Sequence, residues 1–326
     1  MLAALEATLK LSPAQLSQLI HQMNRMDLAR ADYGYIKQKV VELIDGFAYF
    51  VRQAQSGESL FRVRPNPPSR PVRRSDLGAP PPEAVRGFQR CNPPGVPYFY
   101  AASRRITALK ESRVSLGDVV YLSEWGGAYP FPACLVFDPK KLPMDGADAS
   151  NNVVQAYFDT LMTRRVAADF SDEYKLTAAI TEQFTTKHFG GDASSVGEDG
   201  SLAVVYPSVF DRESSFNWAM PAAFAVERLM LRHVTELVVV KAPDGMGFRA
   251  LDNAITLDGE NLTWTGDPDY LPALRQYKDV TVLKKLSEKA AGMPLVAKPL
   301  PPDYLMTLLE EHPYSELLPS GRPDKS

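Results

Sequence analysis

Three short segments of this chain carry residue types that could do chemistry on a phosphate-bearing ligand. They are Phe61-Arg62-Val63, the stretch from Arg90 to Glu111, and Tyr206-Pro207-Ser208. An arginine guanidinium binds phosphate oxygens through two parallel hydrogen bonds and keeps its charge. A carboxylate such as that of Glu111 stabilises positive charge that develops on a sugar carbon when a glycosidic bond breaks. Together these groups suit a phosphate-bearing ligand in which a glycosidic bond is broken.

The charged candidates also have ordinary structural interpretations. Arg62 lies in a predicted strand and Arg90 at the entry from a loop into a strand, and each could instead form a surface ion pair. Arg64 shares a strand face with Arg62 and could replace it as the phosphate ligand. Glu111 could be a solvated acid at the end of a helix, beside Lys110.

Tyr100 and Ser208 extend the candidate site. Tyr100 could stack on an aromatic ring of a ligand, or it could belong to the core of an aromatic-rich strand. Ser208 ends a buried-type strand, so its hydroxyl could bond a carboxamide or a ribose hydroxyl, or it could simply be a turn serine. No histidine lies near it in sequence and Gly-x-Ser-x-Gly is absent, which argues against a nucleophile.

The elements that must position these groups indicate an α+β fold, because strands run beside segregated helices without strict βαβ alternation. We predict strands at 60–63, 98–102, 118–125, 133–137, 202–206, 236–241 and 248–257, and helices at 107–111, 153–163, 172–188 and twice within 280–312. Ser103 is the expected cap of the helix that carries Glu111. An apolar stripe from Tyr33 to Val51 predicts one helix ended by Gly57, and 190–200 is a polar loop.

Several other kinds of chemistry are poorly supported. The formal net charge of −3 does not suggest the basic face that nucleic-acid binding needs. Neither Gly-x-Gly-x-x-Gly nor a P-loop is present, so a Rossmann redox domain and an NTPase are not indicated. The histidines His21, His188, His233 and His312 are scattered without metal-ligand spacing, and we expect no metal site.

The composition also bears on location. Cys91 and Cys134 are the only cysteines, which fits a reducing compartment. Glu6 stands where a signal peptide carries basic residues, and no apolar run approaches the roughly 20 residues of a membrane span. We expect a cytoplasmic protein, or an effector delivered into the cytoplasm of a target cell.

The order and spacing of the three segments resemble those of the RES-domain family, named for an arginine, a glutamate and a serine. The resemblance covers about 59–242 and is best from Arg90 to Glu111. It implies that Arg62 or Arg90 supplies the arginine, Glu111 the glutamate and Ser208 the serine. Asn217 is a looser match to a further polar position of the family.

This resemblance implies a compact fold similar to ADP-ribosyltransferase toxins, with a mixed sheet and flanking helices. Its members degrade NAD+ by hydrolysis or phosphorolysis, and some transfer ADP-ribose to a protein. The implied catalytic residues are Glu111, Arg62 and Ser208, and the implied substrate-binding residues are Arg90, Tyr100, Asn217 and Arg64. NAD+ would be a substrate, with phosphate as a potential co-substrate and no cofactor. The chain departs from the family at Cys91 and in the proline-rich loop 65–86.

We therefore expect three parts: a helical N-terminal extension at 1–57, a catalytic RES domain at 58–245, and a C-terminal extension at 246–326 packed on it. The leading hypothesis is a toxin-like enzyme that cleaves the nicotinamide–ribose bond of NAD+. The alternatives are a mono-ADP-ribosyltransferase acting on a protein and a catalytically inactive binding module. A toxin would need an antitoxin or immunity protein that blocks its pocket; we expect no nucleic-acid or membrane partner.

Overall fold

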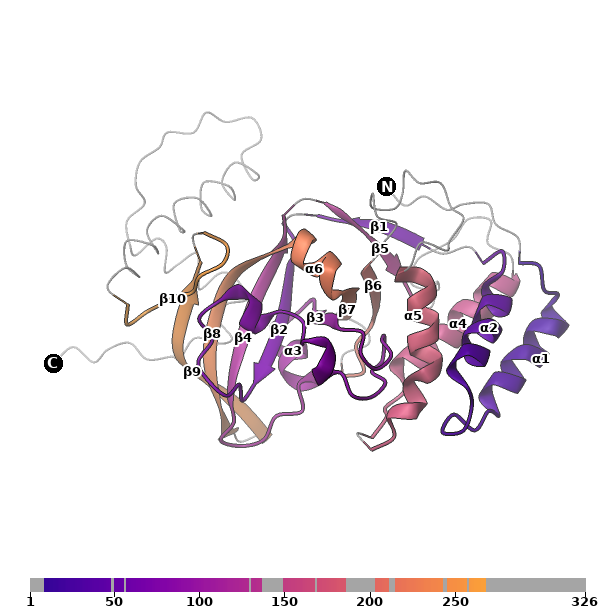
Figure 1. Ribbon diagram of the computed structural model, residues 1–326, viewed down its shortest axis with the longest axis horizontal. Helices are drawn as coiled ribbons and strands as arrows, with labels where there is room; N and C mark the ends of the chain where they lie inside the picture. Colours follow the sequence, from indigo (N-terminus) through magenta and orange to yellow (C-terminus); the bar gives the residue numbers. More distant parts are fainter. Residues whose placement is uncertain are drawn as a thin grey trace, which may run out of the picture. The chain divides into compact units, whose positions relative to one another are not determined.

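The computed structural model describes residues 9–47, 50–55, 57–128, 130–136, 149–167, 169–185, 203–210, 215–242, 245–256 and 258–267. The chain divides into two compact units (Figure 1). The first comprises Met1–Arg62, Gly78–Glu111 and Trp125–Met230, and the second comprises Val63–Leu77, Ser112–Glu124 and the chain from Leu231 onward. Both helices and a mixed sheet are present, so the predicted α+β class is confirmed.

The strands of the first unit are ordered β1-β5-β6-β7-β3-β2. Neighbours β5 and β6 run parallel, and the other neighbouring pairs are antiparallel. Their bounds are β1 Phe50–Ala54, β2 Ser59–Pro65, β3 Tyr98–Ala102, β5 Phe131–Leu135, β6 Ala203–Pro207 and β7 Phe216–Pro221. Tyr206 pairs with Asn217, Asn217 with Ala102, and Ala102 with Phe61, so one row of residues crosses four strands.

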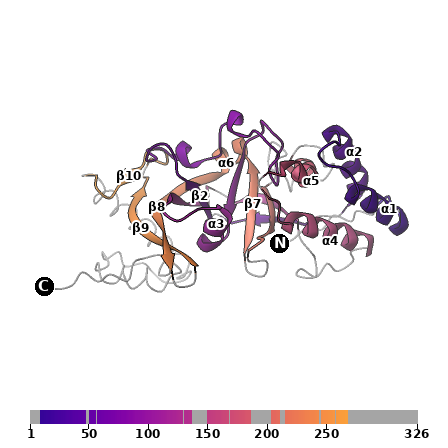
Figure 2. The same ribbon diagram turned by 90° about the horizontal axis from the view of Figure 1, so that it is seen from below.

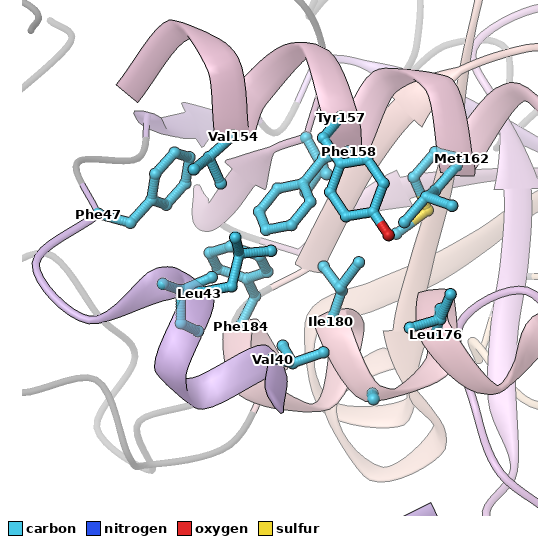
Figure 3. Packing of buried hydrophobic residues seen from close by; sticks show 14 of the residues in the cluster. Val40, Leu43, Phe47, Val154, Tyr157, Phe158, Met162, Leu176, Ile180 and Phe184 are labelled. Carbon is cyan, nitrogen blue, oxygen red and sulfur yellow. The ribbon is translucent and has the colours of Figure 1, made fainter. Parts of the chain in front are cut away.

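A group of four helices packs beside β6 in the same unit (Figures 1 and 2). These helices are α1 Pro13–Asn24, α2 Tyr33–Ile44, α4 Ala149–Thr163 and α5 Lys175–Thr185. Their apolar side chains interdigitate around three aromatic rings (Figure 3): the centroid of Phe47 lies 5.5 Å from that of Phe158 and 6.4 Å from that of Phe184. The predicted helical N-terminal segment therefore shares a core with α4 and α5.

The prediction of one helix from Tyr33 to Val51 was wrong in its second half. Asp32 caps α2 by accepting from the Tyr35 N–H, but the helix ends at Ile44, and Val51 lies in β1. Gly46 has φ of 81°, a left-handed conformation that commonly terminates helices. The apolar spacing continued past this break because Phe47 enters the same core from a loop.

The strand and helix that precede the candidate carboxylate were predicted well. β3 spans Tyr98–Ala102, and α3 spans Arg105–Glu111 with Thr107, Ala108 and Leu109 buried. Ser103 was expected to cap this helix. Its hydroxyl instead accepts a hydrogen bond from the Phe216 N–H at 2.9 Å, which links the residues between β3 and α3 to β7.

The second unit contains the end of β2 and most of β4 (Val119–Gly127) and β8 (Leu229–Ala242), together with β9 (Gly245–Ile255) and β10 (Thr263–Trp264). The strand predicted at 236–241 is found within β8, and the strand predicted at 248–257 overlaps β9, which ends at Ile255. The Arg70 guanidinium lies 3.8 Å from the Trp264 ring centroid and pairs with Glu236 and Asp252, which joins β8, β9 and β10.

Some predictions concern residues that are not described. The loop predicted at 190–200 and the two helices predicted within 280–312 lie outside the described residues. The boundaries at 57/58 and 245/246 stay predictions. None of the helices among the described residues has the length and apolar character needed to cross a membrane.

Candidate functional site

The carboxylate of Glu111 is the centre of a hydrogen-bonded cluster in the first unit. Glu111 is the last residue of α3. Its Oε1 accepts from the Ser208 hydroxyl at 2.8 Å, from Asn217 Nδ2 at 2.9 Å and from the Val209 N–H at 3.3 Å. Three donors on one oxygen fix the direction of the carboxylate, and hydrogen bonds to an ionised acceptor are stronger than those between neutral groups.

The donors reach Glu111 because the sheet aligns the segments that carry them. Asn217 sits in β7, paired with Tyr206 of β6 and Ala102 of β3. Ser208 follows the last residue of β6, and its N–H donates to the Ser215 carbonyl just before β7. Ser208 and Asn217 are buried, whereas Glu111 is half-buried.

Arg62 lies elsewhere on the same sheet. Its Nη1 donates to the Tyr100 carbonyl at 2.9 Å, and its guanidinium lies 5.1 Å from the Phe99 ring centroid. Phe61 shares a cross-strand row with Asn217, and side chains alternate along a strand, so Arg62 and Asn217 belong to opposite faces. The contacts give Arg62 a role in packing β2 against β3; its role in binding a phosphate stays a prediction.

Arg90 closes the end of a helix. Its guanidinium donates to the carbonyls of Met162 and Arg164, and it lies 5.2 Å from the Tyr174 ring centroid. A cation at a helix C-terminus satisfies carbonyls that lack intrahelical partners and complements the helix dipole. Arg90 thus links the loop before β3 to α4, and substrate binding by this residue stays a prediction.

Arg64, the other arginine predicted to bind substrate, belongs to the second unit. Its role in binding also stays a prediction.

Tyr100 secures the turn that precedes β3. Its hydroxyl donates to Asn92 Oδ1 and accepts from the Cys91 N–H at 2.9 Å. Asn92 Nδ2 donates to the Val96 carbonyl at 2.8 Å, which holds the turn together across its ends. Gly95 within the turn has φ of 75°, a left-handed conformation that favours glycine. The ring of Tyr100 is half-buried and packs against the core; stacking on a substrate ring stays a prediction.

The chain resembles one known family of domains over most of its described length. The sequence model of the RES-domain family matches residues 59–245, which is more than half of the 326 residues. The chain belongs to the RES-domain family. This confirms the resemblance seen over 59–242, and domains of this family are generally connected with NAD+ and with toxin–antitoxin systems. Comparisons with curated proteins and with solved structures found no match.

Within this RES domain, the structure brings together Glu111, Ser208 and Asn217 from segments that are far apart in sequence. Sequence reasoning missed the main-chain N–H of Val209, because a backbone donor leaves no mark in residue type. It also missed Phe210, whose N–H donates to the Ser208 hydroxyl at 3.1 Å. An exposed aromatic residue two positions after a strand-end serine was the available signal for it.

Metal ligands and a reactive thiol are two further features that an active site can have. The described residues hold no group of three or more His, Cys, Asp and Glu placed to bind a metal ion. Cys91 is a buried free thiol, and burial raises its pKa to about 11. At neutral pH Cys91 is therefore a thiol and not a thiolate, which is the nucleophilic form of cysteine.

Proposed function

We propose that this RES domain cleaves the nicotinamide–ribose bond of NAD+ and releases nicotinamide. The observation that carries the proposal is the Glu111 carboxylate, held by Ser208, Val209 and Asn217 through one oxygen. Positive charge develops on the ribose carbon as this bond breaks. A fixed carboxylate beside that carbon stabilises the charge without having to reorganise during the reaction.

The leaving group also fits a site of this composition. Nicotinamide is bound to ribose through a positively charged ring nitrogen, so it departs as a neutral molecule and needs no proton donor. The electrons of the broken bond stay with the ring, and the ribose carbon then accepts a nucleophile. With water the product is ADP-ribose and a proton is released; with phosphate the product is ADP-ribose-1″-phosphate. Both acceptors leave the role of Glu111 unchanged.

The test is to incubate the purified full chain with NAD+, with and without inorganic phosphate, and to separate the products by chromatography. Free nicotinamide with ADP-ribose indicates hydrolysis, and ADP-ribose-1″-phosphate indicates phosphorolysis. Labelling of an added protein by ADP-ribose would favour the transferase alternative. Absence of nicotinamide release under every condition would contradict the proposal and favour the binding module.

A pair of serine variants tests how Glu111 is held. Ser208→Ala removes one hydrogen bond to the carboxylate, and we expect kcat for nicotinamide release to fall roughly tenfold with little change in KM for NAD+. Ser208 is a positioning residue in this view, because it acts through Glu111. The measurement is the steady-state rate against NAD+ concentration.

Ser215→Ala is the matched control. Ser215 is equally buried, and its hydroxyl lies 3.2 Å from Ser103 Oγ and not on Glu111. Loss of stability in urea unfolding should be similar in the two variants, whereas loss of kcat should be confined to Ser208→Ala. Equal losses of kcat would mean that the serines act only through stability, and the orienting role of Ser208 would be wrong.

A further inference from the structure

An exposed aromatic ring and a guanidinium lie together next to the Glu111 cluster. The side chain of Phe210 is 46% exposed, although it is large and apolar. The guanidinium of Arg165, which follows α4, lies 5.2 Å from the Phe210 ring centroid. We call these two residues the Phe210–Arg165 pair. Both belong to the first unit, as Glu111 does.

Hydrogen bonds fix the main chain of Phe210 relative to the carboxylate. The Phe210 N–H donates to Ser208 Oγ at 3.1 Å, and Ser208 Oγ donates to Glu111 Oε1 at 2.8 Å. The intervening Val209 N–H also donates to Glu111 Oε1. An isolated exposed apolar side chain is normal and needs no explanation. Phe210 differs because two hydrogen bonds link its backbone to the carboxylate and a cation accompanies its ring.

The pair has the chemistry of a nucleotide subsite. Base–aromatic stacking accepts any base, because every base presents a π-face. A guanidinium that lies on an aromatic ring still has donors in its own plane, and these match phosphate oxygens. The side chain of Arg165 is exposed. The two side chains therefore suit an aromatic base and a phosphate of one ligand.

The charge of the pair selects between the two halves of a dinucleotide. The nicotinamide ring of NAD+ is positively charged, and a ring that already faces a guanidinium is a poor partner for a second cation. Adenine is neutral. We propose that Phe210 stacks on the adenine of NAD+ and that Arg165 binds its adjacent phosphate. This inference rests on NAD+ as the substrate, which is the proposed function.

Binding of AMP to the full chain, measured by titration calorimetry, tests the subsite without any turnover of NAD+. Removing one stacked ring or one charged phosphate contact costs on the order of tenfold in affinity. We expect Phe210→Ala and Arg165→Ala each to weaken AMP binding about tenfold. Phe210→Trp should retain affinity because it keeps an aromatic face, whereas Phe210→Leu should lose it while keeping apolar bulk.

Two controls and a second ligand sharpen the test. Phe170→Ala removes another exposed phenylalanine, and Arg30→Ala removes another exposed arginine; neither should change AMP binding. Adenosine lacks the phosphate, so its affinity should depend on Phe210 and not on Arg165. In kinetics, Phe210→Ala should raise KM for NAD+ about tenfold and leave the reaction of nicotinamide mononucleotide unchanged, because that substrate has no adenine.

The proposal fails if AMP does not bind to the wild-type chain, or if Phe210→Ala binds AMP as tightly as the wild type does. A larger effect of Phe210→Ala on nicotinamide mononucleotide than on AMP would also overturn it, since the ring would then serve the other half of NAD+. AMP binding that depends on both residues in a chain that never cleaves NAD+ would uphold the subsite and contradict the proposed function.

Discussion

Replacing Glu111 with alanine is expected to lower the rate of nicotinamide release from NAD+ by roughly 10²- to 10³-fold, with the protein still folded. The magnitude is that of removing one preorganised electrostatic group from a site where charge develops. The Ser208, Val209 and Asn217 donors converge on a single oxygen of this side chain, so the substitution also leaves them without their acceptor. The measurement is kcat from steady-state nicotinamide release.

Two further variants separate charge from structure. Glu111→Gln keeps an oxygen that can accept from Ser208 and Asn217 but has no negative charge, so it should be nearly as slow as Glu111→Ala. Glu42→Ala removes an exposed carboxylate of α2, which pairs with Lys39 at 2.7 Å, and should leave the rate unchanged. Nicotinamide release near the wild-type rate from a folded Glu111→Ala sample would exclude Glu111 as the catalytic carboxylate.

How much of this fold was predictable depended on what each segment packs against. Strand β3 and helix α3 were predicted to within two residues, because an aromatic-rich strand segment is followed directly by a short helical segment. β7 was missed. It lies between β6 and β3, and its four inner residues, Asn217 to Met220, are all buried, so it lacks the alternation of a half-exposed strand. Asn217 also interrupts the continuous apolar run by which a fully buried strand such as β6 is recognised.

The candidate site was also predictable in part. Glu111 and Ser208 are 97 residues apart in the chain, yet motif spacing predicted both, and the structure joins them by a hydrogen bond. The surroundings of the arginines could not be predicted in this way. In the sequence, an arginine that binds a phosphate looks the same as one that, like Arg62, contacts an aromatic ring and a main-chain carbonyl. The strand register shows on which face of the sheet the arginine lies, and the sequence does not give that register.

Expression of the wild-type chain alone in a bacterial host is expected to arrest growth and deplete NAD+, while the Glu111→Ala form is tolerated. An enzyme that cleaves NAD+ without control empties a pool that the host needs. We therefore propose that the chain has a neutralising partner, an antitoxin or immunity protein that covers the Glu111 site. The measurements are growth after induction and the cellular NAD+ content of both strains at matched protein levels.

The two readouts must change together if NAD+ cleavage causes the arrest. A fall in NAD+ should precede the growth arrest, and Glu42→Ala should behave as the wild type does, because it leaves the Glu111 cluster intact. Growth arrest by wild type and Glu111→Ala alike, with constant NAD+, would point to toxicity of expression itself. If both forms are harmless and NAD+ stays constant, the toxin interpretation fails and the inactive binding module becomes the leading hypothesis.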